Sequence, residues 1–348
     1  MPLPLAPLGT LYGALVRTRL RLYRAGFLKS EKVGVPVISV GNITAGGTGK
    51  TPLVEWAARA LAGEGRRACV LTRGYGRADE RRRVVASDGE RVLADFEECG
   101  DEPRLLAERL VGAASVVCDR DRVAAARWAR EHLGADAFVL DDGFQHLRIA
   151  RDLDIVTLDA TGPWGGGHLL PRGRLREPRE SLARADCVVI TRAELADDLE
   201  TLRAEAARLS GGRAAVIASR MRRRGLAQLN PSAGSPNDEH EGRAVKNDAA
   251  AFCAVGNPRA FFEQLRREGF GLRLTRAFAD HHRFTQADVD GVAREAARSG
   301  ARVLLTTAKD AVKLRGLRFT LPCYVVEIGL EFEDEGRLLG LVRAALSG

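Results

Sequence analysis

The residues best suited to chemistry lie in a glycine-rich loop near the start of the chain. An apolar run, Val35–Val40, leads through this loop into Gly49-Lys50-Thr51 and then into a segment with helical character. Glycines let successive backbone N–H groups curl around phosphate oxygens, and a helix N-terminus adds its partial positive charge. Lys50 would reach the β- and γ-phosphates of a nucleotide, and the Thr51 hydroxyl would bind Mg²⁺. The predicted phosphate-binding residues are Thr44, Ala45, Gly46, Gly47, Thr48, Gly49, Lys50 and Thr51.

The loop departs in one position from the strict P-loop pattern, because Thr44 stands where that pattern has its first glycine. An incidental glycine turn is the competing interpretation. The strand before the loop, the helix after it and the Lys50-Thr51 pair together favour a nucleotide site.

Two adjacent carboxylates, Asp141 and Asp142, end the apolar run that begins at Phe138. Ligands of open α/β folds bind at the carboxyl ends of the parallel strands, so these side chains are expected to face the glycine loop. One of them should hold Mg²⁺ directly or through water, and the residues leave open which one does. A solvated turn is the alternative interpretation.

Three further clusters carry more polar groups than a turn requires. Arg73 follows an apolar run and could contact phosphate. Asp101 and Glu102 precede a predicted helix, where an aspartate alone is typical of an N-cap. His281 and His282 lie in a loop before another helix. Adjacent histidines point in different directions, so one acid–base histidine is a better interpretation than a shared metal site.

The N-terminal segment, residues 8–27, combines an apolar arc with a basic back. Arg17, Arg21 and Arg24 gather opposite that arc, while Arg19 lies within it. Four arginines exclude a spanning helix, and the order of charged and apolar parts does not match a signal peptide. An interfacial membrane helix and a helix packed on its own domain both remain open. The apolar arc comprises Leu8, Leu11, Tyr12, Leu15, Val16, Leu20, Leu22, Tyr23 and Phe27.

These residues must be positioned by alternating strands and helices. Strand-length apolar runs separated by helix-length segments predict a mostly parallel sheet covered on both faces. A polar, turn-forming stretch around residues 220–250 reads as a linker, and a shorter α/β region follows it. The expected strands are Val35–Val40, Cys69–Leu71, Ser115–Cys118, Phe138–Leu140, Ile155–Leu158, Cys187–Ile190, Ala214–Ile217, Phe252–Val255, Val303–Thr306 and Tyr324–Ile328.

Composition fits a globular protein with a sizeable core. The chain has 348 residues, 45% of them hydrophobic and 29% charged, with a net charge of +8 that favours anionic partners. Six scattered cysteines without a C-x-x-C pair predict buried free thiols, and a zinc site is not expected.

Taken together, the motifs resemble the tetraacyldisaccharide 4'-kinases, which phosphorylate a lipid A precursor. The resemblance implies a P-loop NTPase-like, mostly parallel sheet domain with a second, smaller α/β domain and an active site between them. The matching stretches are the N-terminal Leu-Tyr/Arg helix, Ser39–Asn42, Gly46–Pro52, Arg73–Tyr75, Gly100–Pro103, Asp141–His146, Leu175–Pro178, Gly256–Pro258, Phe278–His281 and Lys309-Asp310.

The resemblance also implies roles and a setting. Asp101 would be the general base and His281 its partner, Arg73 and Gln145 would join the ATP-binding residues, and Mg²⁺ would be held among Thr51, Glu102, Asp141 and Asp142. The substrate would be a glycolipid, with peripheral association at the cytoplasmic face of the bacterial inner membrane. Neither a nucleic acid nor an obligate protein partner is expected. The expected boundaries are an amphipathic helix at 1–30, a kinase domain at 31–220, a linker at 221–250 and an α/β domain at 251–348.

Some positions depart from the family's pattern, and a second class of protein also has to be considered. Arg172 and Arg174 stand where the family usually has small residues or proline, and Ala308 stands where glutamate commonly precedes Lys-Asp. These departures bear on substrate recognition. Another P-loop kinase or a regulatory NTPase would share the glycine loop, but the stretch Thr307–Asp310 lacks the spacing of a guanine-reading motif.

Overall fold

The computed structural model describes residues 5–229 and 246–347, and the chain forms two compact units. The first comprises Met1–Met221 and Leu330–Gly348, and the second comprises Arg222–Gly329. The part of the predicted linker at 230–245 lies outside the described residues.

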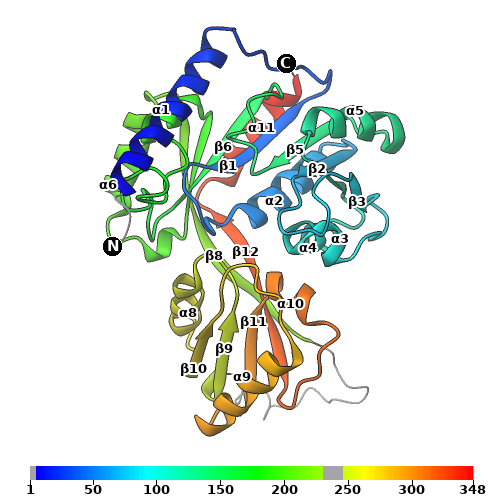
Figure 1. Ribbon diagram of the computed structural model, residues 1–348, viewed down its shortest axis with the longest axis vertical. Coiled ribbons are helices and arrows are strands. Elements are labelled where there is room, and N and C mark those ends of the chain that lie inside the picture. The colour runs from blue at the N-terminus through cyan, green and yellow to red at the C-terminus, as the bar shows by residue number, and fades with distance from the viewer. Residues whose placement is uncertain (1–4, 230–245, 348) are drawn as a thin grey trace. The chain divides into compact units, whose positions relative to one another are not determined.

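The first unit is built on strands in the order β8-β7-β6-β1-β5-β2-β4-β3 (Figure 1). All neighbours in this series run parallel except β3, which is antiparallel to β4. The central strands are buried along their whole length, as expected where helices cover both faces of a parallel sheet. The strands are β1 (Val37–Asn42), β2 (Ala68–Thr72), β3 (Val84–Ser87), β4 (Ala114–Cys118), β5 (Ala137–Asp141), β6 (Leu153–Asp159), β7 (Cys187–Thr191) and β8 (Ala215–Gln228).

Alternate residues of each strand pack into separate hydrophobic cores on the two faces of the sheet. Ile38 packs with helix α2 (Lys50–Gly63) on one face, whereas Val37 packs with α5 (Arg122–Leu133) on the other. The remaining helices of this unit are α1 (Leu5–Arg24), α3 (Phe96–Cys99), α4 (Asp101–Arg109), α6 (Leu199–Leu209) and α11 (Glu335–Ser347), with 3₁₀ turns at Arg179–Arg184 and Ala193–Leu195.

The C-terminal helix α11 belongs to this first unit. The sequence had instead placed it in the α/β domain expected at 251–348. Leu338 and Val342 of α11 are fully buried in the same core as Leu53 of α2, and the Trp56 Nε1 donates a hydrogen bond to Glu335 Oε1 (2.7 Å). Burial of this apolar face holds the end of the chain against the P-loop domain. Strand β8 also extends into the stretch expected to be a linker.

The second unit contains four parallel strands in the order β10-β9-β11-β12. Ala250 and Phe252 face a core shared with α9 and α10, and the alternate residues Ala251 and Cys253 face a core shared with α8. The mostly parallel α/β fold with a smaller second α/β unit is therefore confirmed. The elements are β9 (Ala249–Cys253), α8 (Pro258–Arg267), β10 (Leu272–Ala277), α9 (Gln286–Arg298), β11 (Val303–Thr307), α10 (Ala308–Leu314) and β12 (Cys323–Phe332).

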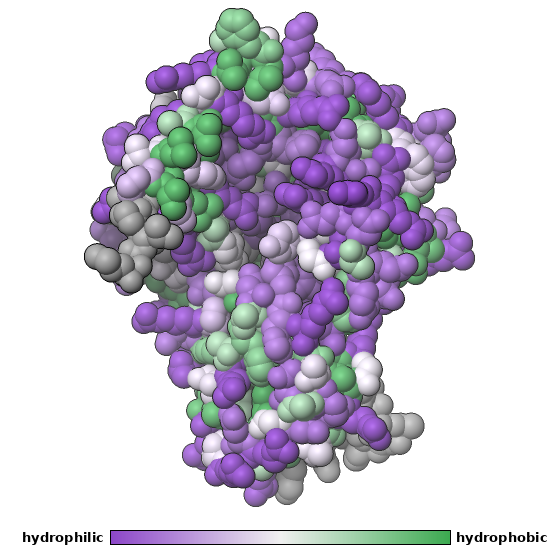
Figure 2. Space-filling view, in the orientation of Figure 1, coloured by the Kyte–Doolittle hydropathy of each residue, from purple (hydrophilic) through white to green (hydrophobic). Residues whose placement is uncertain are grey.

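Helix α1 carries two separate apolar stripes. One stripe packs against the first unit, where the Tyr12 hydroxyl donates to the Arg176 carbonyl (2.9 Å) and the buried Gly13 lies close to Leu169. The other, here called the leucine stripe, is 38–63% exposed and appears as a green band along α1 in Figure 2. At 3.6 residues per turn the leucine stripe, the packed stripe and the basic stripe lie about 100–140° apart. The leucine stripe consists of Leu8, Leu11, Leu15 and Leu22.

All six cysteines are buried free thiols, as expected, and burial raises the pKa of Cys69 to about 12. Among the described residues, no helix has the length and apolar character needed to cross a membrane.

Candidate active site

The glycine loop joins the end of β1 to the start of α2, and two of its glycines adopt backbone angles that L-residues rarely take. Gly46 has φ of 115° and Gly49 has φ of 79°. A Cβ on Gly49 would lie 2.5 Å from Met221 Cε and 3.4 Å from Thr191 Cγ2. Glycine is therefore required at this position both by its conformation and by the close approach of β7 and β8.

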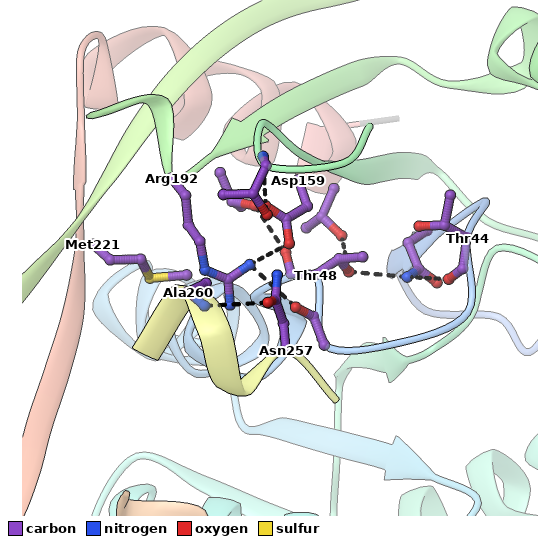
Figure 3. A network of polar contacts seen from close by, with 12 residues as sticks. Thr44, Thr48, Asp159, Arg192, Met221, Asn257 and Ala260 are labelled. Atoms are coloured by element: carbon purple, nitrogen blue, oxygen red, sulfur yellow. Dashed lines mark hydrogen bonds and ion pairs between the residues drawn. The ribbon is translucent and has the colours of Figure 1, made fainter. Parts of the chain in front are cut away.

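Side chains from β1 and β7 fix the shape of this loop. The Asn42 amide donates to the Thr44 carbonyl (2.6 Å) and to Thr48 Oγ1 (2.9 Å), and the Thr191 hydroxyl donates to the Thr48 carbonyl (2.9 Å). Arg192 Nη1 donates to the Gly47 carbonyl (3.1 Å). These contacts, seen in Figure 3, occupy loop carbonyls and the Thr48 side chain without using the loop's N–H groups.

A second set of contacts joins the loop to β6. Thr157 and Thr48 share a hydroxyl–hydroxyl hydrogen bond of 2.8 Å, and buried Asp159 pairs with Arg192 at 2.5 Å. Figure 3 shows Asp159 and Arg192 side by side at the end of the loop. Protein groups thus hold the loop in a fixed shape, which lowers the cost of binding a phosphate there.

Three charged side chains meet beside the start of α2. Lys50 Nζ lies 3.4 Å from Asp142 Oδ1, and Arg176 Nη1 lies 2.6 Å from Asp142 Oδ2. Asp142 itself follows β5 with a positive φ of 52°. Burial alone would raise the pKa of Asp142, but the charges of Lys50 and Arg176 outweigh burial and hold that pKa well below its ordinary value.

Asp141 sits in a more negative environment than its neighbour. Its Oδ2 accepts a hydrogen bond from the Thr72 hydroxyl (2.9 Å). Burial, followed by the nearby charges of Glu102 and Asp142, raises the pKa of Asp141 to about 6. The charges of Glu102 and Asp142 repel that of Asp141, and a cation would relieve this repulsion.

This environment fits Mg²⁺. The described residues include no group of three or more His, Cys, Asp or Glu side chains that could hold a metal by themselves. Mg²⁺ rarely needs one, because it keeps several waters and is bound through one or two carboxylates and the phosphates of the substrate. Asp141, Asp142 and the first-turn Thr51 supply hard oxygen atoms of the required kind.

Asp101 and Glu102 occupy the first turn of α4. Gly100, with φ of 97°, takes the cap position, so Asp101 is the first helical residue and not the N-cap. The Asp101 side chain is buried, and its Oδ1 accepts a hydrogen bond from the Glu102 backbone N–H (2.9 Å). The proximity of Glu102 to Asp141 joins this turn to the carboxylate cluster.

The two histidines of the second unit have different surroundings. His281, at φ of 61°, has its Nε2 3.8 Å from Asp280 Oδ2, and Asp280 also pairs with Lys309 (3.2 Å). His282 Nε2 lies 3.2 Å from Asp288, and its ring stacks on Phe278 at a centroid distance of 4.9 Å.

Two residues predicted to bind ATP make contacts with other protein groups. Arg73 pairs with Glu80 (3.3 Å), and both side chains are exposed. The Gln145 amide donates to the Asn42 carbonyl (2.9 Å), so Gln145 supports the end of β1 behind the loop. Five further residues of the site carry no recognisable motif in the sequence, because they come from strand ends and loops distant from the glycine loop: Thr157, Asp159, Arg176, Thr191 and Arg192.

A model of the Tetraacyldisaccharide-1-P 4'-kinase family matches residues 1–347. The chain belongs to the tetraacyldisaccharide 4'-kinase family. It is 47% identical over 323 residues to a tetraacyldisaccharide 4'-kinase of Anaeromyxobacter dehalogenans strain 2CP-C, covering 88% of this chain and 83% of the relative. It is 42% identical over 318 residues to the kinase of that name from Pelobacter propionicus, covering 90% of this chain and 83% of the relative.

A solved member of the tetraacyldisaccharide 4'-kinase family has the same fold. The "apo" form of LpxK from Aquifex aeolicus, in complex with ATP, is 31% identical, with a TM-score of 0.76 and coverage of 98% of both chains. The resemblance drawn from the sequence motifs is confirmed, and with it the class of enzyme, a kinase that phosphorylates an alcohol group. The alternative of a regulatory NTPase is set aside by the family match.

Proposed function

We propose that this kinase transfers the γ-phosphate of ATP to the 4'-hydroxyl of the tetraacyldisaccharide 1-phosphate precursor of lipid A, using the P-loop of its first unit. The observation that carries the proposal is the convergence of Lys50 and Arg176 on Asp142 beside a preshaped glycine loop. Positive charge there can turn from the carboxylate toward phosphate when a nucleotide binds. The family membership supplies the acceptor.

The loop residues have distinct tasks in this proposal. Backbone N–H groups of Gly46–Gly49 and the N-terminus of α2 would bind phosphate oxygens, and Lys50 would stabilise charge on the β- and γ-phosphates. Thr51, Asp141, Asp142 and Glu102 are the proposed surroundings of Mg²⁺. When bound, Mg²⁺ neutralises charge on the phosphates during transfer.

Asp101 is the proposed general base. An alcohol is a weak nucleophile, so its proton must leave as the new bond to phosphorus forms. A carboxylate of ordinary pKa is a poor base at neutral pH, and a partner that orients it increases its effect. His281 is the proposed partner, on the strength of its match to the family motif in the sequence.

The experiment that tests the proposal follows the label of γ-labelled ATP. The kinase is incubated with ATP, Mg²⁺ and tetraacyldisaccharide 1-phosphate in detergent, and the lipid is extracted. Label in the lipid, released by cleavage of a 4'-phosphate ester, is the expected result. Label that remains in ATP or appears only as free phosphate would contradict the proposal.

We also propose peripheral association with the cytoplasmic face of the inner membrane, through the leucine stripe of α1. Its leucines are exposed although each would gain roughly 1.5–3 kcal/mol by leaving water. Arg17, Arg21 and Arg24 lie exposed on the same helix, where each could add on the order of 1 kcal/mol near an anionic surface.

Replacing two leucines of the stripe should test this association. The double variant Leu11→Gln/Leu15→Gln should lower partitioning to vesicles that contain anionic phospholipid by at least about tenfold, because two side chains lose their apolar burial. Ala14→Gln, exposed on the same helix between the leucine and basic stripes, is the matched control. Vesicle flotation measures the effect, and partitioning should also fall as salt rises. Equal flotation of wild type and double variant would refute the proposed surface.

A further inference from the structure

A short extended segment runs antiparallel to the first residues of the glycine loop. The Ala45 N–H donates to the Arg174 carbonyl (2.6 Å), and the Arg176 N–H donates to the Ile43 carbonyl (2.7 Å). Thr44 and Leu175 are the paired residues between these two bonds. Backbone pairing therefore fixes residues 174–176 against the loop.

Because residues 174–176 are extended, their side chains alternate between two faces of the segment. Leu175 is 3% exposed and packs with Ile43 and Phe144 in the core. Successive side chains of an extended strand point to opposite faces, so Arg174 and Arg176 share the face away from that core. Arg176 reaches Asp142 on this face, which is the side where Lys50 lies.

The Arg174 guanidinium lies against the loop itself. Its Nε donates to the Ala45 carbonyl (2.9 Å). A Cβ on Gly46 would overlap its Nη2 and lie 3.0 Å from its Cζ, so the guanidinium occupies the space that the missing side chain of Gly46 leaves. An arginine from outside the motif thus stands beside the glycines that would hold phosphate.

Arg174 differs in its ion pairing from three other arginines of the first unit. Arg176 is paired with Asp142, Arg184 with Glu177, and Arg192 with Asp159. Arg174 makes no ion pair with any described carboxylate. Its planar fork therefore has donors left to bind phosphate oxygens, which no carboxylate of the described residues occupies.

We propose that Arg174 is a further catalytic residue, an arginine supplied by the same chain that contacts the γ-phosphoryl group of ATP during transfer. This inference rests on the proposed function of the loop. The bond between the γ-phosphorus and the oxygen that leaves with ADP breaks, the bond to the 4'-oxygen forms, and the hydroxyl proton leaves to the base. Arg174 exchanges no proton; its guanidinium stabilises the charge on the γ-phosphoryl oxygens, as arginine fingers do.

The test compares Arg174→Ala and Arg174→Lys with Arg208→Ala, a control at an exposed arginine of α6 in the same unit. Arg174→Ala should lower kcat by roughly 10²-fold or more, while ADP affinity changes by less than about threefold, since ADP lacks the γ-phosphoryl group. Arg174→Lys should restore little, because an ammonium group lacks the planar fork. Arg208→Ala should resemble wild type. ADP binding and thermal unfolding show that each variant is folded.

Two outcomes would overturn the inference. One is a kcat of Arg174→Ala within about threefold of wild type. The other is an equal loss of ADP and ATP affinity with kcat retained, which would make Arg174 a brace for the loop. Lys50→Met, assayed in parallel, separates this failure from that of the proposed function. If Lys50→Met transfers phosphate normally, the loop is not the site; if it is inactive while Arg174→Ala is normal, only the role of Arg174 is wrong.

Discussion

The two units each contain a lysine–aspartate pair, and the pairs differ in almost everything but residue type. In the first unit, Lys50 and Asp142 are 3.4 Å apart with side chains 14% and 36% exposed. In the second unit, Lys313 and Asp310 are 2.8 Å apart and only 2% and 0% exposed. Asp310 also accepts hydrogen bonds from the Thr307 hydroxyl (2.7 Å) and the Ala254 N–H (3.0 Å).

On the proposed function, the same two charges serve a site in the first unit and the fold in the second. Asp142 is shared by Lys50 and Arg176, so Lys50 can turn toward phosphate while Asp142 keeps a partner. Asp310 is fixed by groups of its own core, and losing Lys313 would leave a buried carboxylate without a compensating charge. The two roles are distinguished by how deeply the pair is buried and by whether the aspartate keeps another charged partner when the lysine is removed. The presence of an ion pair alone does not distinguish them.

The largest expected effect is a loss of turnover, and it compares Asp101 and His281, the proposed site residues, with His282, whose contacts support the fold. Asp101→Ala and His281→Ala should each lower turnover by roughly 10²–10⁴ while ATP affinity stays nearly unchanged, because in their proposed roles as base and partner they act on the proton and not on the nucleotide. The double variant should be little worse than the worse single variant, since residues that act as a unit are not additive. Steady-state kinetics with lipid acceptor measures all three.

His282→Ala is the matched control for this prediction. His282 pairs with Asp288 and stacks on Phe278, so its loss should lower stability and leave turnover per folded molecule largely intact. Fully additive losses at Asp101 and His281, or a larger catalytic defect at His282 than at His281, would mean that the pair is assigned wrongly.

A smaller effect, on stability, is expected in the second unit. Lys313→Met should lower the free energy of unfolding by about 3–5 kcal/mol, because it strands the buried Asp310 charge. Lys50→Met, the same change at the more exposed pair, should alter stability by less than about 1 kcal/mol. Denaturant unfolding of both variants gives the comparison. Equal losses of stability would remove the distinction between the two pairs.

Most of the fold could be predicted because its strands are continuous apolar runs. The run Cys187–Ile190, for example, becomes β7 (Cys187–Thr191). Strand β10 was missed because arginines interrupt its apolar residues, and it is only partly buried. The placement of α11 in the first unit could not be read from the sequence, since an amphipathic helix does not show which core it will join.

The residues of the candidate site were likewise predicted only in part from the sequence. Lys50 and the two aspartates at the end of β5 were found because local motifs carry them, and the structure brings Lys50 to Asp142. Thr191 was missed because only the parallel sheet brings its segment to the loop, and Arg176 was missed because an isolated antiparallel bridge brings residues 174–176 there. Helix α1 was ambiguous for a physical reason: its apolar residues form a packed stripe and an exposed stripe, and a single helical wheel merges them.

The most direct test of the central claim is a single-turnover measurement on Lys50→Met with γ-labelled ATP and tetraacyldisaccharide 1-phosphate. Wild type should transfer label to the lipid in one fast phase. Lys50→Met should unfold like wild type yet transfer label at least about 10²-fold more slowly, because it loses a charge that acts on the γ-phosphate. Lys313→Met, assayed where it is still folded, should transfer label within about threefold of wild type. Normal transfer by folded Lys50→Met would contradict the account, because the phosphate would then be handled elsewhere.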